Sequence, residues 1–132
     1  MKSNPIQIVL LMMLCTVAIA EENAAVTAAR DDAGDREPLL TVVPVYPEQA
    51  RRARVEGEVQ VCFDVSRTGK TSRVAVRSST NRIFEKPSRD AVEASTYRPL
   101  AADKVLSGIK TCRTFQFHLT PVAIEMPAQA PG

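Results

Sequence analysis

Two segments with alternating apolar residues constrain the fold of this chain more than any other feature. They span residues 57–65 and 111–119. A side-chain period of two places successive residues on opposite faces of an extended chain, so each segment predicts a β-strand with one buried face. The apolar positions are Val59, Val61, Phe63 and Val65 in the first segment, and Phe115, Phe117 and Leu119 in the second.

The residues after the first segment predict a β-hairpin. Thr68-Gly69 favours a turn, because Gly tolerates the backbone angles that tight turns need. Val74 and Val76 then alternate with other residues over 73–77. We therefore expect a second strand that returns antiparallel to the first.

Two helices are expected outside the strands. Pro47 suits the first position of a helix and Gly57 lies beyond its end, which predicts a short helix within 47–54. A longer helix is predicted over 84–97 and ends before Pro99, which cannot continue it.

The first 20 residues predict a cleavable secretory signal peptide. Lys2 gives a positive start, an apolar run extends from Ile6 to Ala20, and Ala18 and Ala20 form an A-x-A cleavage site before Glu21. The alternative is an uncleaved membrane anchor. Against it, the apolar run has 15 residues, and a helix needs roughly 20 to cross a bilayer.

Composition divides the rest of the chain into three parts. Residues 21–40 are rich in Ala and charged residues and are expected to form a flexible leader. Residues 41–120 contain all the predicted elements and are expected to form one domain. Residues 121–132 contain three prolines and a glycine and are expected to be a disordered tail.

Cleavage of the signal peptide would leave two cysteines, Cys62 and Cys112, and an even number in a secreted chain favours a disulfide. Both fall on the polar faces of their strands. If these strands are antiparallel neighbours, the two side chains meet across a non-hydrogen-bonded pair, with Cα atoms about 4.5 Å apart. We therefore expect a disulfide, which would stabilise the small domain by roughly 4 kcal/mol.

Charge and residue types exclude several classes of function. Lys2 is the one charged residue before residue 21, so 16 Lys and Arg oppose 15 Asp and Glu in the remainder. This balance argues against nucleic-acid binding by bulk charge. A single His with two cysteines falls short of the four ligands of a zinc site. No catalytic constellation has a defensible spacing, so we expect no enzyme activity, metal or cofactor.

The order and spacing of these motifs resemble the C-terminal domain of TonB, the periplasmic energy transducer of Gram-negative bacteria. Tyr46-Pro47 with Ala50 is similar to the Y-P-x-x-A that opens the family's domain. Residues 57–69 reproduce its G-x-V-x-V-x-F-x-V-x-x-x-G signature. Where the family tends to have Trp, this chain has Ser95. The further matches are Val74, Val76, Ser79, Phe84, Ala91, Tyr97, Pro99, Phe115, Phe117 and Leu119.

The resemblance implies an α+β fold with a small three-stranded antiparallel sheet and two helices packed on one face. It also implies a non-catalytic periplasmic module that recognises an extended peptide segment of an envelope partner, such as a TonB-dependent outer-membrane transporter, by strand addition. From the order of strands, the exposed edge is expected at residues 110–119. The partner-binding residues expected there are Thr111, Arg113, Thr114, Phe115, Gln116, Phe117 and His118.

Three alternatives stay open at this point. If residues 1–20 are retained, the chain is a membrane-anchored energy-transducer component of TonB-dependent transport. If the basic cluster Arg51, Arg52 and Arg54 contacts acidic polymer, the chain is a structural envelope protein that binds peptidoglycan. An unpaired strand edge would also allow a homodimer.

Overall fold

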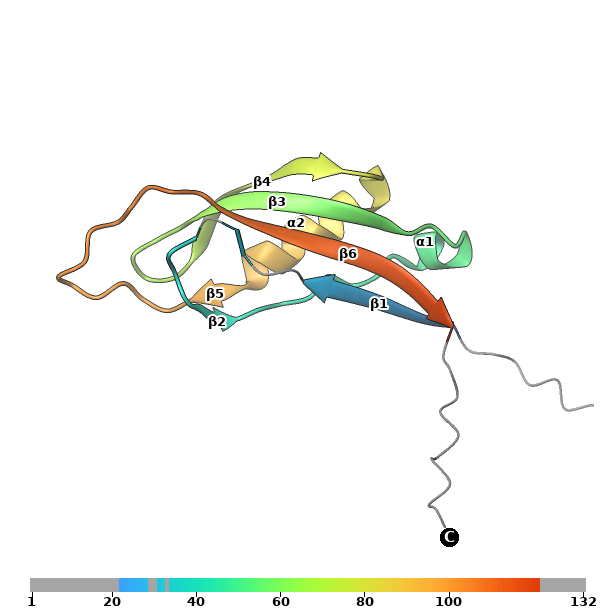
Figure 1. Ribbon diagram of the computed structural model, residues 1–132, viewed down its shortest axis with the longest axis horizontal. Helices are drawn as coiled ribbons and strands as arrows, with labels where there is room; N and C mark the ends of the chain where they lie inside the picture. Colours follow the sequence, from blue (N-terminus) through green and yellow to red (C-terminus); the bar gives the residue numbers. More distant parts are fainter. Residues whose placement is uncertain (1–21, 29–30, 33, 122–132) are drawn as a thin grey trace, which may run out of the picture.

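The computed structural model describes residues 22–28, 31–32 and 34–121. The predicted signal peptide, its cleavage site at Ala18, Ala20 and Glu21, and the tail from residue 122 lie outside the described residues. A four-stranded antiparallel sheet in the order β1-β6-β3-β4 forms the centre of the molecule (Figure 1). Its strands are β1 (Glu22–Ala28), β3 (Gly57–Val65), β4 (Thr71–Ser79) and β6 (Thr111–Pro121).

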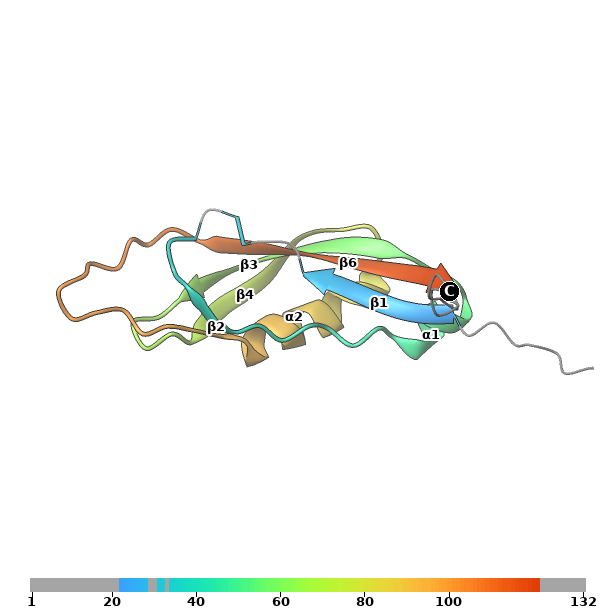
Figure 2. The same cartoon turned by 60° about the horizontal axis from the view of Figure 1, so that its bottom comes forward.

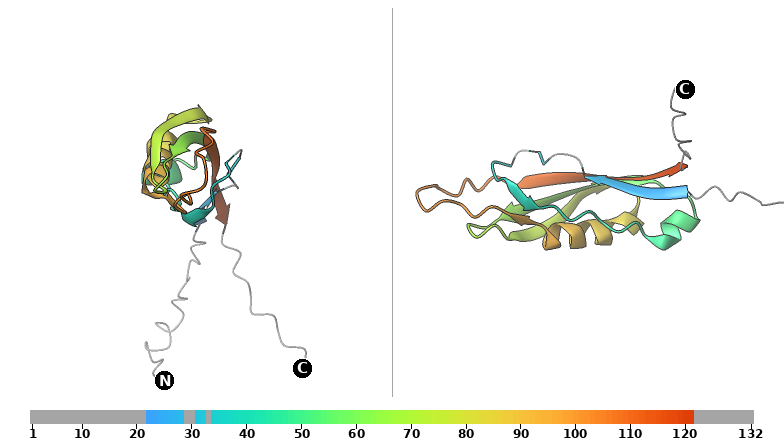
Figure 3. Two further views of the ribbon diagram at one scale, coloured as in Figure 1. Left: turned by 90° about the vertical axis from the view of Figure 1, so that its left-hand side faces the viewer. Right: turned by 90° about the horizontal axis from the view of Figure 1, so that it is seen from below.

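Helices cover one face of this sheet, as the turned views show (Figures 2 and 3). They are α1 (Glu48–Arg52), the 3-10 turn η3 (Arg82–Phe84) and α2 (Glu85–Ala94). Two short strands, β2 (Pro38–Leu40) and β5 (Thr96–Tyr97), pair with each other beside the sheet. The predicted α+β fold with helices on one face is confirmed. No helix in the described ranges is long and apolar enough to span a bilayer.

The predicted number of strands is wrong, because residues expected to belong to a flexible leader form a fourth strand. The 21–40 segment contributes β1 and β2, and β1 pairs antiparallel with β6 from Glu22↔Pro121 to Ala28↔Phe115. Val26 and Ala28 are half-buried and pack against the core, whereas Thr27 between them is exposed. This period of two is short and Ala-rich, which explains why the composition alone did not indicate a strand.

The hydrophobic core lies between the helices and the inner face of the sheet. It combines the alternating positions of β3 and β6 with residues of both helices. Phe84 and Phe117 stack with ring centroids 4.3 Å apart, and Tyr46 meets both rings edge-on at 5.6 Å. The fully enclosed members are Ala50, Val59, Val61, Phe63, Phe84, Val92, Phe115 and Phe117.

Helix α2 ends at Ala94, three residues earlier than predicted, because the following residues pair with the β3–β4 turn. The backbone of Ser95 is already extended, and the N–H of Tyr97 donates to the carbonyl of Gly69 at 2.8 Å. Gly69 has φ +89°, and a Cβ there would lie 1.9 Å from the carbonyl oxygen of Tyr97. This close approach requires glycine at position 69.

Candidate functional site

The strand expected to be the exposed edge, β6, is paired along both sides in the structure. β3 pairs with it from Gly57↔Phe117 to Phe63↔Thr111, and β1 pairs with it on the opposite side. Beyond the end of β1, Asp32 continues the contact by exchanging two backbone hydrogen bonds with Cys112, at 2.8 and 3.1 Å. The prediction that residues 110–119 are a free edge is therefore wrong for this conformation, in which β1 and β4 are the outer strands.

The side chains of the seven predicted binding residues divide between the two faces of β6. Thr111, Arg113, Phe115 and Phe117 are buried on the side of the helices. Thr114, Gln116 and His118 lie on the other face, where Gln116 is exposed and the other two are half-buried. On this face Gln116 donates to the Glu58 carboxylate at 3.1 Å, and its amide oxygen lies 3.2 Å from Nε2 of His118.

The backbone groups of these residues also alternate, and they identify which residues can receive a strand. In an antiparallel ladder, successive residues direct their N–H and C=O to opposite sides. Cys112 bonds to Asp32, on the β1 side. Thr114, Gln116 and His118 therefore offer their backbone groups to the β1 side as well, and the odd-numbered residues of β6 offer theirs to β3.

The disulfide expected between Cys62 and Cys112 is present. The two residues are register partners in β3 and β6, with Cα atoms 4.1 Å apart. Because the backbone groups of Cys112 bond to Asp32, they point away from Cys62, which makes this the non-hydrogen-bonded kind of pair that the sequence argument required.

A buried ion pair joins the leader to the start of β6. The Arg113 side chain is 2% exposed, and its Nε and Nη2 donate to the two carboxylate oxygens of Asp31 at 2.5 and 2.9 Å. Nη2 also donates to the Tyr97 hydroxyl at 2.7 Å, and that hydroxyl donates to Asp31 at 2.5 Å. The guanidinium stands 6.0 and 5.7 Å from the ring centroids of Phe63 and Tyr97. We call Asp31, Tyr97 and Arg113 the latch.

The electrostatics of the latch follow from burial and from the Asp31 carboxylate. Burial raises the pKa of the Tyr97 hydroxyl above its ordinary value, and the hydrogen bond to Asp31 raises it further. Burial acts to lower the pKa of Arg113, but the hydrogen bonds and negative charge of Asp31 more than offset this, so the pKa is raised. Arg113 is therefore a permanent cation held in an apolar setting by one carboxylate.

Ser95, at the position where the family tends to have Trp, is part of the same region. It is 1% exposed, and its hydroxyl donates to the Ala91 carbonyl at 2.8 Å. The same oxygen accepts from the Val42 N–H at 3.0 Å and from Nη1 of Arg113 at 3.3 Å. The small residue thus supplies an acceptor for the guanidinium in the core.

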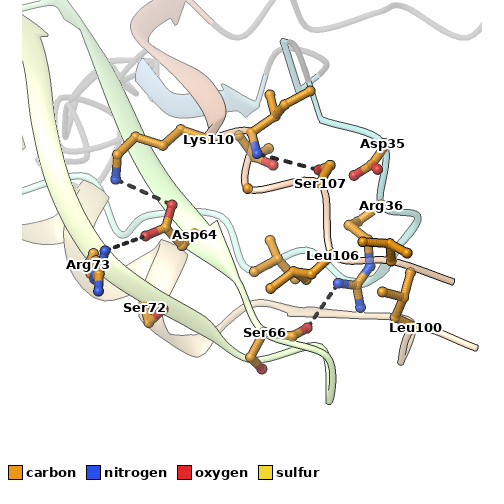
Figure 4. Close-up of a pocket in the computed structure, with 15 residues that line it drawn as sticks. Asp35, Arg36, Asp64, Ser66, Ser72, Arg73, Leu100, Leu106, Ser107 and Lys110 are labelled. Carbon is orange, nitrogen blue, oxygen red and sulfur yellow. Dashed lines mark hydrogen bonds and ion pairs between the residues drawn. The ribbon is translucent and has the colours of Figure 1, made fainter. Parts of the chain in front are cut away.

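A hollow of about 450 Å³ lies between the loop before β6 and the ends of β3 and β4 (Figure 4). Asp64 is its central charge, with Lys110 Nζ at 3.3 Å and Arg73 Nη1 at 3.8 Å from its carboxylate. Arg36 donates to the Ser66 carbonyl at 2.9 Å. These contacts connect the segments around the hollow, and Asp64, Lys110 and Arg73 neutralise one another, which indicates a structural role for them.

Two residues of the basic cluster, Arg51 and Arg52, lie in α1 and share a partner in that helix. Arg52 pairs with Glu48 at 2.9 Å, and Arg51 lies 3.9 Å from the same carboxylate. The side chains of Glu48, Arg51 and Arg52 are exposed, which is typical of a solvated helix face.

Sequence reasoning missed Asp31, Tyr97 and Ser95 as partners of Arg113. One signal pointed toward them: Arg113 shares a face with Phe115 and Phe117, and a charge on the buried face of a strand requires an opposite charge nearby. The position of Asp31 in the leader hid that partner.

Comparison with known proteins identifies the family. The family model described as Gram-negative bacterial TonB protein C-terminal matches residues 42–119. A solved structure similar to this one is the solution NMR structure of the Pseudomonas aeruginosa TonB CTD. It is 26% identical with a TM-score of 0.47, and the match covers 70% of this chain and 90% of that chain. No curated protein matches the chain.

Proposed function

Because the chain belongs to the TonB C-terminal domain family, we propose that it binds an extended peptide segment of an envelope partner by strand addition along β6. Domains of this family are periplasmic, non-catalytic protein-binding modules. The partner we propose is a periplasmic segment of a TonB-dependent outer-membrane transporter. The residues that receive it are those whose backbone groups face the β1 side: Thr114, Gln116 and His118.

One observation carries this proposal: the β1 side of β6 already accepts an added strand. Residues Glu22–Ala28 occupy it over seven register positions, and they come from a segment far from β6 in the sequence. An edge that accepts this segment offers the N–H and C=O spacing that any extended peptide can match. The side chains at 111, 113, 115 and 117 support the strand from the core.

The test uses a substitution that removes one backbone donor and leaves the core intact. Gln116 is exposed, so Gln116→Pro removes an N–H on the β1 side without a buried volume change. Gln116→Ala is the matched control. Synthetic peptides from the periplasmic segments of the organism's outer-membrane transporters are the probes. We expect a peptide that the unaltered chain and Gln116→Ala bind, and at least a tenfold loss for Gln116→Pro. Equal binding by all three proteins contradicts the proposal.

We further propose that the chain reaches the periplasm through cleavage between Ala20 and Glu21. The A-x-A site and the short apolar run support this. The intact mass of the native protein tests it: a soluble species that begins at Glu21 supports it, and a full-length species in the inner membrane favours an anchored transducer component instead.

A further inference from the structure

The site proposed above is occupied by the chain's own leader. β1 covers the part of β6 from Phe115 onward, and Asp32 covers Cys112. Figures 1 and 2 both show β1 along the outer side of β6. An incoming strand cannot use the backbone groups of Gln116 or His118 until these leader residues leave.

We propose that residues 22–28 with Asp31 and Asp32 are a built-in competitor for the β6 edge, fastened by the latch, and that a partner segment which replaces them carries a carboxylate for Arg113. The inference rests on the proposed function, because it names the regulation and the partner chemistry of that same edge.

The apolar contacts of β1 are small, which suits a strand that can leave. The β1 residues that pack against the core are Val26 and Ala28, and Val26 is the larger of the two. Val26 and Ala28 are partly buried at the border of the core, while the fully enclosed core residues all lie in other elements. Removal of β1 therefore uncovers one side of the core without taking a central side chain from it.

The latch supplies the directional contacts that hold the leader against the domain. Asp31 accepts from Nε and Nη2 of Arg113 and from the Tyr97 hydroxyl, so one carboxylate has three donors. Such charge-assisted, two-point contacts are stronger and more directional than those between neutral groups. They lie next to the backbone hydrogen bonds between Asp32 and Cys112. Cys112 is also joined to β3 by its disulfide with Cys62, so the leader is attached to β6 at its disulfide-bonded end.

When Asp31 leaves, the buried charge of Arg113 loses its partner, and the incoming segment must supply a new one. The Arg113 guanidinium is buried 6.0 and 5.7 Å from the ring centroids of Phe63 and Tyr97, where an unpaired charge is strongly unfavourable. A surface hollow of about 330 Å³, lined in part by Asp31, Arg36 and Arg113, adjoins the ion pair and gives an incoming side chain room. A peptide with an acidic residue after its paired strand meets this requirement, and a neutral peptide does not.

The experiment uses the leader's own sequence as the probe, so that it does not depend on an unidentified partner. A labelled peptide of residues 21–32 is titrated into the full chain and two variants, with fluorescence anisotropy as the readout. Ala25→Pro removes an N–H that alternation directs toward β6, and Ala24→Pro, the matched control, removes one directed away from it. A tethered strand outcompetes a free one, so the unaltered chain should bind weakly.

We expect Ala25→Pro to bind the peptide at least tenfold more tightly than the unaltered chain and Ala24→Pro. A peptide with Asn in place of Asp31 should bind Ala25→Pro at least tenfold more weakly. Equal affinities for the three proteins overturn the built-in competitor, and equal affinities for the two peptides overturn the carboxylate requirement.

A crosslinked variant keeps the test decisive if Ala25→Pro fails to fold. Thr27 and Gln116 are exposed register partners, so cysteines at both positions can join β1 to β6. A transporter peptide that the unaltered chain binds should bind the crosslinked protein at least tenfold more weakly. Unchanged binding means that the peptide uses another surface, which contradicts both the proposed site on β6 and its regulation by the leader. If instead Ala25→Pro binds the leader peptide but no transporter peptide, the inference stands and the proposed function fails.

Discussion

Arg113 and Asp31 lie 82 positions apart in the sequence, yet the guanidinium of one donates two hydrogen bonds to the carboxylate of the other. The pair joins the segment before the matched family region to β6, an inner strand of the sheet. Because Arg113 is buried and Asp31 belongs to the leader, the pair connects the stability of the domain to the position of β1.

Removing one partner of the ion pair should destabilise the folded protein more than replacing both partners. Asp31→Asn should lower the free energy of unfolding by about 3 kcal/mol, because it leaves a buried unpaired charge. The double variant Asp31→Asn with Arg113→Met should lose much less, since an apolar side chain suits the surroundings of Phe63 and Tyr97. Urea unfolding of the single and double variants measures this coupling. Additive losses would contradict the latch.

The disulfide should account for a large share of the stability of this small domain. The bond closes a segment with a sequence separation of 50. In the chain-entropy model its removal, by Cys62→Ala with Cys112→Ala, should lower the free energy of unfolding by about 4 kcal/mol. Denaturant midpoints of the variant and of the oxidised chain give the difference. A loss well below 1 kcal/mol would show that the bond constrains little.

Two glycines offer a matched comparison of backbone strain and close approach. Both have positive φ, but a Cβ at Gly69 meets the Tyr97 carbonyl at 1.9 Å, whereas at Gly108 nothing lies within 4 Å. Gly69→Ala should lower the free energy of unfolding by about 3 kcal/mol or more, and Gly108→Ala by roughly 1 kcal/mol. The melting temperature should therefore fall much further for Gly69→Ala than for Gly108→Ala. Equal losses would contradict the contact between the hairpin turn and β5.

Tyr97 should make the fold sensitive to alkaline pH. Its pKa is raised in the folded protein, so its contribution to stability is complete below the ordinary tyrosine pKa of about 10 and is lost as the pH rises through the folded value. The chain has two tyrosines, and Tyr46→Phe isolates Tyr97. Phenolate absorbance of that variant should appear well above pH 10, together with unfolding. Ionisation near pH 10 in the folded state would contradict the buried hydrogen bond to Asp31.

Much of the domain was predictable because its strands carry strong local patterns. The alternation over 57–65 and 111–119 predicted β3 and β6, and their shared register followed from the positions of Cys62 and Cys112. These features are periodic or covalent, so a single sequence displays them.

The leader was not predictable in the same way. Its strand contains one β-branched apolar residue, Val26, among alanines, and Ala is not enriched in strands. Its order depends on tertiary pairing with β6 and on Asp31 reaching Arg113. Sequence patterning indicates that Arg113 needs a partner of opposite charge, but it does not indicate which acidic residue supplies it. For this reason the binding strand was correctly located as an element but wrongly expected to have a free edge.

The most direct measurement is native-state amide hydrogen exchange along β6 in the unaltered chain. If β1 is a displaceable occupant, the N–H groups of Thr114, Gln116 and His118 exchange when the leader opens, whereas those of Arg113, Phe115 and Phe117 stay bonded to β3 until the domain unfolds. We expect alternating protection, with the even-numbered amides exchanging at least tenfold faster and Asp31→Asn widening the difference. Uniform protection along β6 would show that β1 is a permanent part of the sheet and does not leave to admit a partner.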